Sequence, residues 1–354
     1  MNQQPLEVLL AEATPFIDVR APAEFATGTV PGAINLPLLT DDERHQVGIT
    51  YKQQGTDAAV ALGEALVSGT TKQQRIEGWA AAAATHPDSW LYCWRGGLRS
   101  RTACDWLADR GIHVPRVEGG FKALRNCCLN VLERAASTDA ATPAAIPAIG
   151  KEWLVLAGRT GTGKTILLRE QPDSIDLERL ANHRGSAFGA QPCAQPAPVS
   201  FENSLAVAYL QLRSERVLLE DESRTIGRLA LPASWHQRMQ QAPLLVLERS
   251  LGERAAIIRQ EYVDEPLAAG TPASDLHERY RGALDRIRKR LGGARHSEVA
   301  QALSRGFETG AHERWIEQLL SWYYDPMYDY QLEQKQDRIM ARGDADEVRA
   351  YLAN

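Results

Sequence analysis

A glycine-rich loop between an apolar run and a helical run constrains the fold of this chain more than any other feature. Residues 158–165 read GRTGTGKT, which matches the pattern GxxxxGK[ST] in full. The segment before it, EWLVLAG at 152–158, has the continuous apolar character of a buried strand. A strand that leads through such a loop into a helix is typical of an α/β domain that binds phosphate. The sequence therefore predicts a P-loop α/β domain.

The P-loop predicts a site for a polyphosphate. Its glycines let backbone N–H groups point at phosphate oxygens, and the helix N-terminus adds positive potential. We expect the Lys164 ammonium on the terminal phosphates and the Thr165 hydroxyl on a magnesium ion. Asp221, with Glu220 and Glu222 beside it, is the second expected magnesium ligand. The full set of expected phosphate-binding residues is Gly158, Gly161, Thr162, Gly163, Lys164 and Thr165.

The rest of the C-terminal part divides into two regions. Apolar runs at 216–221 and 243–249 predict further buried parallel strands, whereas the apolar spacing from residue 251 onward is helical. We therefore expect a P-loop α/β domain over 151–250 and a helical region over 251–354. The stretch before them, STDAATPAAIPAIG at 137–150, lacks apolar periodicity and predicts a linker.

The N-terminal part, residues 1–136, is predicted to be a second α/β domain. Short apolar runs at 16–20, 33–37, 90–93 and 113–120 alternate with helical segments, which indicates a mainly parallel sheet. The third run ends at a cysteine, and a loop with two glycines among three arginines follows it in CWRGGLRSR.

Cys93 is the first residue of this second anion-binding loop. A free thiol has a pKa near ~8.5, and loop N–H groups with Arg95 or Arg99 would favour its thiolate. A thiolate beneath a bound tetrahedral anion suits attack on a sulfur, selenium or phosphorus donor. None of the five cysteines forms a CxxC pair, which argues against structural zinc and against a disulfide framework.

Three weaker features each have functional and non-functional interpretations. The helix-like segment 281–295 carries Arg286, Lys289 and Arg290 on one side, which predicts either a face that tracks tRNA phosphates or a solvated charged face. The aromatic run WYYDPMYDY either stacks on a base, lines a prenyl pocket or packs in a core. The segment HRGS at 183–186, expected after a strand, either grips phosphate or forms a surface turn.

Composition limits the class of protein and its location. The formal net charge of −5 does not by itself indicate a nucleic-acid binder. No apolar run approaches the ~18 residues of a membrane span, and the N-terminus lacks the pattern of a signal peptide. We expect a cytoplasmic protein.

Three blocks of the N-terminal part resemble rhodanese domains. They are IDVRAPAEFATGTVPGAINLPL at 17–38, CWRGGLRS at 93–100 and VEGGFKAL at 117–124. In that family the loop cysteine carries a chalcogen atom. The loop from Cys93 to Arg99 spans seven residues, where the usual sulfurtransferase loop has six and the rhodanese-fold phosphatases share the longer form. A wider loop admits a larger atom or anion.

Together with the P-loop, further blocks at 41–59, 176–189, 219–227 and 323–335 resemble the tRNA 2-selenouridine synthases. The resemblance implies an enzyme, a transferase that acts on wobble 2-thiouridine in tRNA. Geranyl diphosphate would first alkylate the sulfur, and selenium from selenophosphate would then replace the S-geranyl group. The P-loop would hold the diphosphate, and Cys93, Arg95 and Arg99 would be catalytic. Both donors are co-substrates rather than tightly bound cofactors, and a protein that supplies selenophosphate is an expected partner.

Three alternatives remain at this point. An ATP-dependent tRNA sulfurtransferase would use a Cys93 persulfide and a P-loop that activates the uridine oxygen. A phosphatase would account for the long cysteine loop. A non-catalytic nucleotide switch would bind RNA or a partner protein and would retain its function after Cys93→Ala.

Overall fold

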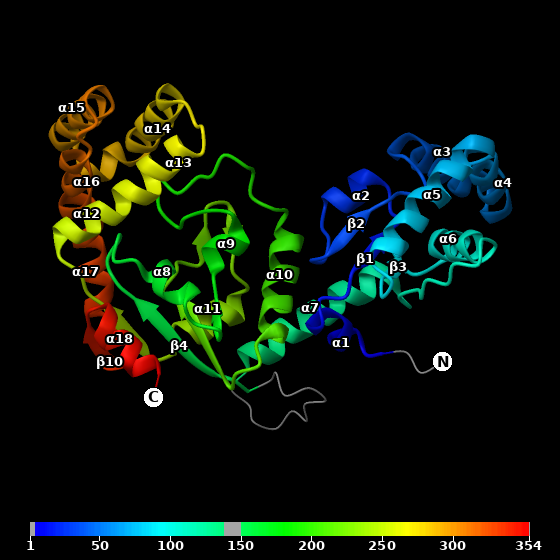
Figure 1. Ribbon diagram of the computed structural model, residues 1–354, viewed down its shortest axis with the longest axis horizontal. Coiled ribbons are helices and arrows are strands. Elements are labelled where there is room, and N and C mark those ends of the chain that lie inside the picture. Colours follow the sequence, from blue (N-terminus) through cyan, green and yellow to red (C-terminus); the bar gives the residue numbers. More distant parts are fainter. Residues whose placement is uncertain (1–3, 138–149, 354) are drawn as a thin grey trace. The chain divides into compact units, whose positions relative to one another are not determined.

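The computed structural model describes residues 4–137 and 150–353, which form two compact units (Figure 1). One unit comprises Met1–Ala135 and Pro196–Gln211, and the other comprises Ala136–Gln195 and Leu212–Asn354. The sequence analysis did not anticipate that residues 196–211 group with the N-terminal unit. The linker expected at 137–150 lies, except for its two end residues, outside the described part of the chain.

The first unit contains a parallel sheet of three strands in the order β2-β1-β3, namely β1 (Phe16–Asp18), β2 (Ala33–Asn35) and β3 (Trp90–Tyr92). The strand expected at 113–120 is wrong, because this segment makes only one bridge, between Leu91 and Arg116. The Pro115 carbonyl accepts the Leu91 N–H at 2.8 Å. Pro115 has no N–H of its own with which to extend the ladder.

Helices surround this sheet. They are α1 (Leu6–Ala11), α2 (Pro22–Ala26), α3 (Asp41–Gln54), α4 (Thr56–Leu66), α5 (Gly69–Thr85), α6 (Leu98–Ala108), α7 (Gly120–Ala136) and α10 (Pro198–Gln211). Thr40 and Glu43 form a capping box that starts α3. Gly55, with φ of 87°, reverses the chain between α3 and α4. Asn203 attaches α10 to this unit, since its side chain donates to the Thr29 carbonyl at 2.9 Å.

The second unit contains a parallel sheet of five strands in the order β10-β9-β4-β6-β5. The strands are β4 (Glu152–Ala157), β5 (Ser174–Ile175), β6 (Arg216–Glu220), β9 (Leu244–Leu247) and β10 (Ile339–Gly343), and a separate hairpin joins β7 (Thr225–Ile226) to β8 (Leu229–Ala230). The predicted strands at 152–158, 216–221 and 243–249 are confirmed. The α/β fold class of both units is confirmed as well.

Strand β10 corrects the expectation of an all-helical region after residue 251. Its residues IMARG alternate between half-buried and exposed positions before Gly343, and the strand lies at the edge of the sheet beside β9. A short edge strand that carries an arginine has no continuous apolar run, so its sequence lacks the signal of a buried parallel strand.

The helices of the second unit cover the sheet and build a separate core beyond it (Figure 1). They are α8 (Lys164–Arg169), α9 (Leu177–Ala181), α11 (Ala233–Met239), α12 (Leu251–Arg259), α13 (Glu265–Ala268), α14 (Ala273–Leu291), α15 (Gly293–Thr309), α16 (Glu313–Leu319), α17 (Asp325–Glu333) and α18 (Ala345–Leu352). Tyr280, Leu284 and Trp315 belong to the core of the helical region. Within residues 4–137 and 150–353, no helix combines the length and apolarity needed to cross a bilayer.

Candidate functional site

The P-loop connects β4 to α8, and two of its glycines are required by geometry. Gly161 has φ of 82°, and a Cβ there would lie 2.9 Å from the Arg254 carbonyl oxygen. Gly163 has φ of 79° and immediately precedes α8 in the left-handed conformation. A side chain at either position would strain the backbone, so the loop keeps its N–H groups free of side-chain obstruction.

Lys164 and Thr165 place polar side chains at the P-loop cavity, which has a volume of about 410 Å³. Lys164 Nζ donates to the Gly158 carbonyl at 2.8 Å and therefore lies folded back across the loop. Thr165 Oγ1 donates to Glu220 Oε2 at 2.9 Å. Thr162 is buried and does not line the cavity, and its hydroxyl donates to the Arg159 carbonyl at 3.0 Å.

Segments distant in sequence complete the wall of the P-loop cavity. HRGS contributes Arg184, Gly185 and Ser186, and the aromatic run contributes Tyr323 and Tyr324. HRGS follows helix α9 rather than the strand that the sequence analysis expected. Both segments had an alternative interpretation without function, and the structure brings both of them to the phosphate-binding loop.

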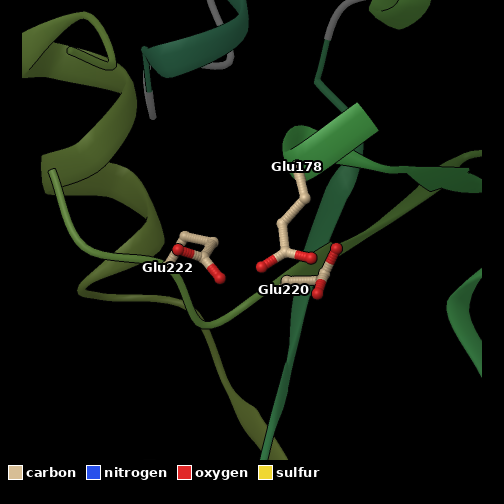
Figure 2. Close-up of side chains that lie close together, drawn as sticks. All are labelled: Glu178, Glu220 and Glu222. Atoms are coloured by element: carbon tan, nitrogen blue, oxygen red, sulfur yellow. The ribbon is translucent and has the colours of Figure 1, made fainter. Parts of the chain in front are cut away.

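Three glutamates converge beside Thr165 (Figure 2). Glu178 belongs to α9, Glu220 ends β6 and Glu222 follows it. One carboxylate oxygen from each glutamate lies within 4.8 Å of those of the other two. Burial, reinforced by mutual repulsion, raises the pKa of Glu178 to about 10 and that of Glu220 to about 8. Burial likewise raises the pKa of Glu222 to about 7, against the opposing charge of Lys164.

The glutamate cluster fits a hard divalent cation. Glu220 is 1% exposed, and its Oε1 atom has no hydrogen-bond partner among the described residues. Carboxylate and hydroxyl oxygens are the donors that Mg²⁺ prefers. A cation among them would also favour the ionised carboxylates that burial disfavours. The lack of a side chain at Gly185 lets the carboxylates of Glu178 and Glu222 lie close to its backbone. A Cβ there would lie 2.7 Å from Glu178 Oε1 and 2.8 Å from both oxygens of Glu222.

Asp221, the predicted magnesium ligand, has another partner. Both its oxygens accept hydrogen bonds from Lys335 Nζ, at 2.6 and 2.7 Å. Successive side chains of an extended segment point to opposite sides, so Glu220 rather than Asp221 faces Thr165. The sequence analysis noted Glu220 and Glu222 as neighbours of Asp221 but missed Glu178, which belongs to a separate helix.

The cysteine loop of the first unit follows β3. Cys93 is 3% exposed, and its Sγ donates to Ser100 Oγ at 3.2 Å. Ser100 lies in the first turn of α6, so the thiol contacts the N-terminal end of the helix after the loop. Gly120 begins α7 against the same loop, where a Cβ would lie 2.2 Å from the Cys93 carbonyl oxygen. The Phe121 N–H donates to that oxygen at 2.9 Å, which joins the CWRGG and VEGGF segments.

The two predicted catalytic arginines differ in their surroundings. Arg95 is exposed beside the loop. Arg99 donates to both carboxylate oxygens of Glu24, at 2.5 and 3.2 Å. Burial acts to raise the pKa of Glu24, but the hydrogen bond and the charge of Arg99 lower it on balance. Arg99 is therefore already neutralised by a carboxylate, and Arg95 is the more available cation of the pair.

The predicted tRNA-binding residues lie on α14. Arg286, Lys289 and Arg290 are all exposed. Arg290 lines the P-loop cavity, and Arg286 donates to the Ala187 carbonyl at 3.1 Å. Two of the three basic side chains thus line the P-loop cavity or contact a segment that lines it.

Known proteins resemble this chain over nearly all its length. A family described as "tRNA 2-selenouridine synthase AAA domain" matches residues 151–354, and one described as "Rhodanese-like domain" matches residues 3–127. The second match confirms the rhodanese resemblance of the cysteine-containing unit.

Full-length relatives bear the name tRNA 2-selenouridine synthase. The protein of Marinobacter nauticus is 48% identical over 352 residues, which cover 95% of this chain and 93% of the relative. That of Shewanella denitrificans is 44% identical over 363 residues, with coverage of 97% and 95%. That of Bordetella bronchiseptica is 45% identical over 356 residues, with coverage of 96% and 94%. With both halves matched and identity this high, the chain belongs to the tRNA 2-selenouridine synthase family.

Proposed function

We propose that the protein converts wobble 2-thiouridine of tRNA to 2-selenouridine in two steps. In the first, the thiouridine sulfur attacks geranyl diphosphate: the S–C bond forms, the C–O bond breaks, and the diphosphate and the N3 proton depart. In the second, selenium from selenophosphate replaces sulfur at C2, geranylthiol leaves, and water cleaves the Se–P bond to release phosphate. Both steps are redox-neutral and need no further reactant.

The observation that supports the first step is the convergence of Lys164, Thr165 and three glutamates in one cavity. A departing diphosphate gains negative charge, and a fixed cation stabilises charge that develops during the reaction. Lys164 would exchange its bond to the Gly158 carbonyl for one to a phosphate oxygen. Thr165 and Glu220, with Glu178 and Glu222, would hold Mg²⁺, which supplies charge neutralisation when bound.

Cys93 supports the second step because it is a nucleophile, whereas the described residues that line the P-loop cavity include no cysteine. Its sulfur would add to C2 of the S-geranyl base and expel geranylthiol, and the selenium of selenophosphate would then displace the Cys93 sulfur. Transfer of selenium onto Cys93 as a selenium–sulfur bond would require an oxidant or the reduction of phosphorus, so we favour the carbon adduct. Arg95 would bind selenophosphate, and a protein that supplies selenophosphate remains the proposed partner.

Mass spectrometry of the nucleosides tests the proposal. Incubation of 2-thiouridine tRNA with geranyl diphosphate should yield S-geranyl-2-thiouridine, and later addition of selenophosphate should yield 2-selenouridine. An adenylated or phosphorylated tRNA formed from ATP would instead support the sulfurtransferase alternative. Hydrolysis of an aryl phosphate by the Cys93 loop would support the phosphatase alternative.

A further inference from the structure

The first unit contains an apolar cavity that is separate from the P-loop cavity. It has a volume of about 510 Å³, within the range of ~300–1,000 Å³ typical of small-molecule sites. Helices α3, α4 and α6 form most of its wall. Apolar side chains dominate the lining, and they include Leu38, Leu39, Val47, Val60, Val67 and Trp106.

This apolar cavity adjoins the cysteine loop. A neighbouring cavity of about 490 Å³ contains Trp94, the residue directly after Cys93. Arg44 and Arg99 line both cavities. The carboxylate of Glu24 forms an ion pair with each guanidinium group. Its Oε1 lies 3.7 Å from Arg44 Nη2, and its Oε2 lies 2.5 Å from Arg99 Nη1. Two arginines that share one carboxylate therefore lie at the boundary between the Trp94 cavity and the apolar cavity.

The first turn of α6 also connects the thiol with the apolar cavity. Ser100 accepts the hydrogen bond from Cys93, while Leu98 and Thr102 line the apolar cavity. If a tRNA base stacked on Trp94, next to Cys93, a hydrocarbon group on the sulfur of that base would extend into the apolar cavity.

The wall of the cavity fits an apolar chain that is attached to an anion. Tyr51 and Leu98 line it although they are 59% and 52% exposed, so apolar surface continues to the mouth. Arg44 and Lys52 are cations of the same lining. Apolar surface left in water is costly, and burial of a hydrocarbon chain against it is favourable. On tRNA that carries the S-geranyl group, backbone phosphates of the same tRNA are the anions that these basic side chains would contact.

We propose that the apolar cavity between α3, α4 and α6 binds the isoprenoid chain of the substrate beside Cys93. This inference rests on the proposed function and deepens it by assigning the chain a site in the first unit. The chain is that of the S-geranyl group on modified tRNA, because the proposed function places geranyl diphosphate at the P-loop of the second unit.

A bulky residue inside the cavity should exclude the chain. Val60 lines the cavity, whereas its neighbour Ala61 is exposed and does not. Purified full-length Val60→Trp and Ala61→Trp proteins would be compared on tRNA that carries either S-geranyl- or S-methyl-2-thiouridine, with selenophosphate. We expect Val60→Trp to lower kcat/KM for the S-geranyl substrate at least tenfold and to leave the S-methyl substrate unchanged. Ala61→Trp should change neither.

A second variant covers the possibility that Val60→Trp fails to fold. Tyr51 is exposed, so Tyr51→Asp should preserve the fold while it places a carboxylate in the cavity wall. It should lower kcat/KM for the S-geranyl substrate several-fold and spare the S-methyl substrate. If both cavity variants match the Ala61→Trp protein on both substrates, the inference is overturned.

The first reaction shows which substrate uses the cavity. Geranylation of 2-thiouridine tRNA by geranyl diphosphate would be measured with the same variants. We expect loss of selenation with normal geranylation, because the cavity binds the thioether, and loss of geranylation with normal selenation would overturn the inference. A wild-type protein that catalyses neither reaction would instead refute the proposed function.

Discussion

The Thr165 hydroxyl donates a hydrogen bond to Glu220 Oε2 over 2.9 Å, and this bond joins the P-loop to the end of β6. Thr165 is the hydroxyl expected on a magnesium ion, and Glu220 is the most buried of the three clustered glutamates. The two side chains therefore lie together where the proposed magnesium ion would bind. The charge state of the cluster then decides whether a cation is held there.

The stability of the magnesium-free protein should fall as the pH rises. Burial raises the pKa of Glu220 from 4.5 to about 8, so the folded state binds more protons than the unfolded state between these values. The contribution of Glu220 to the free energy of unfolding is therefore greatest below pH 4.5. It is lost as the pH rises through the pKa of Glu220 in the folded state. Thermal unfolding measured from pH 5 to pH 8 should show the decline, and millimolar Mg²⁺ should oppose it. A Glu220→Gln protein should lack the part of the pH dependence of thermal stability that Glu220 causes.

Magnesium binding should release protons from the same cluster. The neutral carboxyls must ionise to become ligands, so calorimetric titrations at pH 7 should give enthalpies that depend on the ionisation enthalpy of the buffer. Identical enthalpies in phosphate and Tris buffers would contradict protonated ligands.

Gly185→Ala should weaken cation binding at least tenfold. The added Cβ would meet oxygens of Glu178 and Glu222 within 2.8 Å, and φ of 56° is unfavourable for alanine. Gly270→Ala is the matched control, because φ is 87° there and no atom lies within 4 Å of the added Cβ. Backbone strain should lower the free energy of unfolding of both variants by about 1 kcal/mol. Only Gly185→Ala should lose further unfolding free energy, and only Gly185→Ala should bind Mg²⁺ more weakly in calorimetry.

Cys93→Ala and Lys164→Ala should block different steps. Cys93→Ala should geranylate 2-thiouridine but not selenate it, so S-geranyl-2-thiouridine should accumulate on the tRNA. Lys164→Ala should lower geranylation by orders of magnitude, since it removes a cation from the departing diphosphate. It should still convert tRNA that is supplied with the S-geranyl group. Mass spectrometry identifies each nucleoside, with exposed Cys193→Ala as the control thiol variant. Full selenation by Cys93→Ala would refute nucleophilic catalysis by this thiol.

Charge reversal on α14 should weaken tRNA binding. Replacement of Arg286, Lys289 and Arg290 by glutamate should lower the slope of log affinity against log salt by roughly one for each lost phosphate contact. Arg213, exposed elsewhere in the second unit, is the control site for Arg→Glu. Filter binding across a salt series provides the slopes. Equal slopes in the α14 variant and the wild type would make this segment a solvated face.

The sequence predicts those parts of the fold whose signal is local. Each predicted buried strand of the second unit is a continuous apolar run, and the P-loop has all its determinants within eight residues. Strand β10 and the grouping of helix α10 with the first unit were not predicted, because both depend on partners that are remote in sequence. β10 pairs with β9 from about ninety residues away, and α10 is attached to the first unit through Asn203 and Thr29.

The roles of side chains in the candidate sites also depend on residues that are remote in sequence. Sequence placed an acid at the end of β6, but the choice between Glu220 and Asp221 depends on strand direction and on Lys335. It likewise placed Arg99 beside the thiol but gave no sign of Glu24, which is seventy-five residues away and neutralises it. Motifs identify the chemistry available, whereas ion pairs between distant residues decide which side chain is free to perform it.

The edge position of β10 has a consequence for synthesis on the ribosome. The strand begins at residue 339 and β9 ends at residue 247, so β9 acquires its outer neighbour only after about ninety further residues have been made. Until then, the nascent second unit exposes the unpaired backbone of a buried apolar strand, which is a template for wrong pairing. A chain that stops before residue 339 would carry an intact P-loop motif on an unfinished sheet. Quality control of this protein therefore depends on the synthesis of residues 339–343.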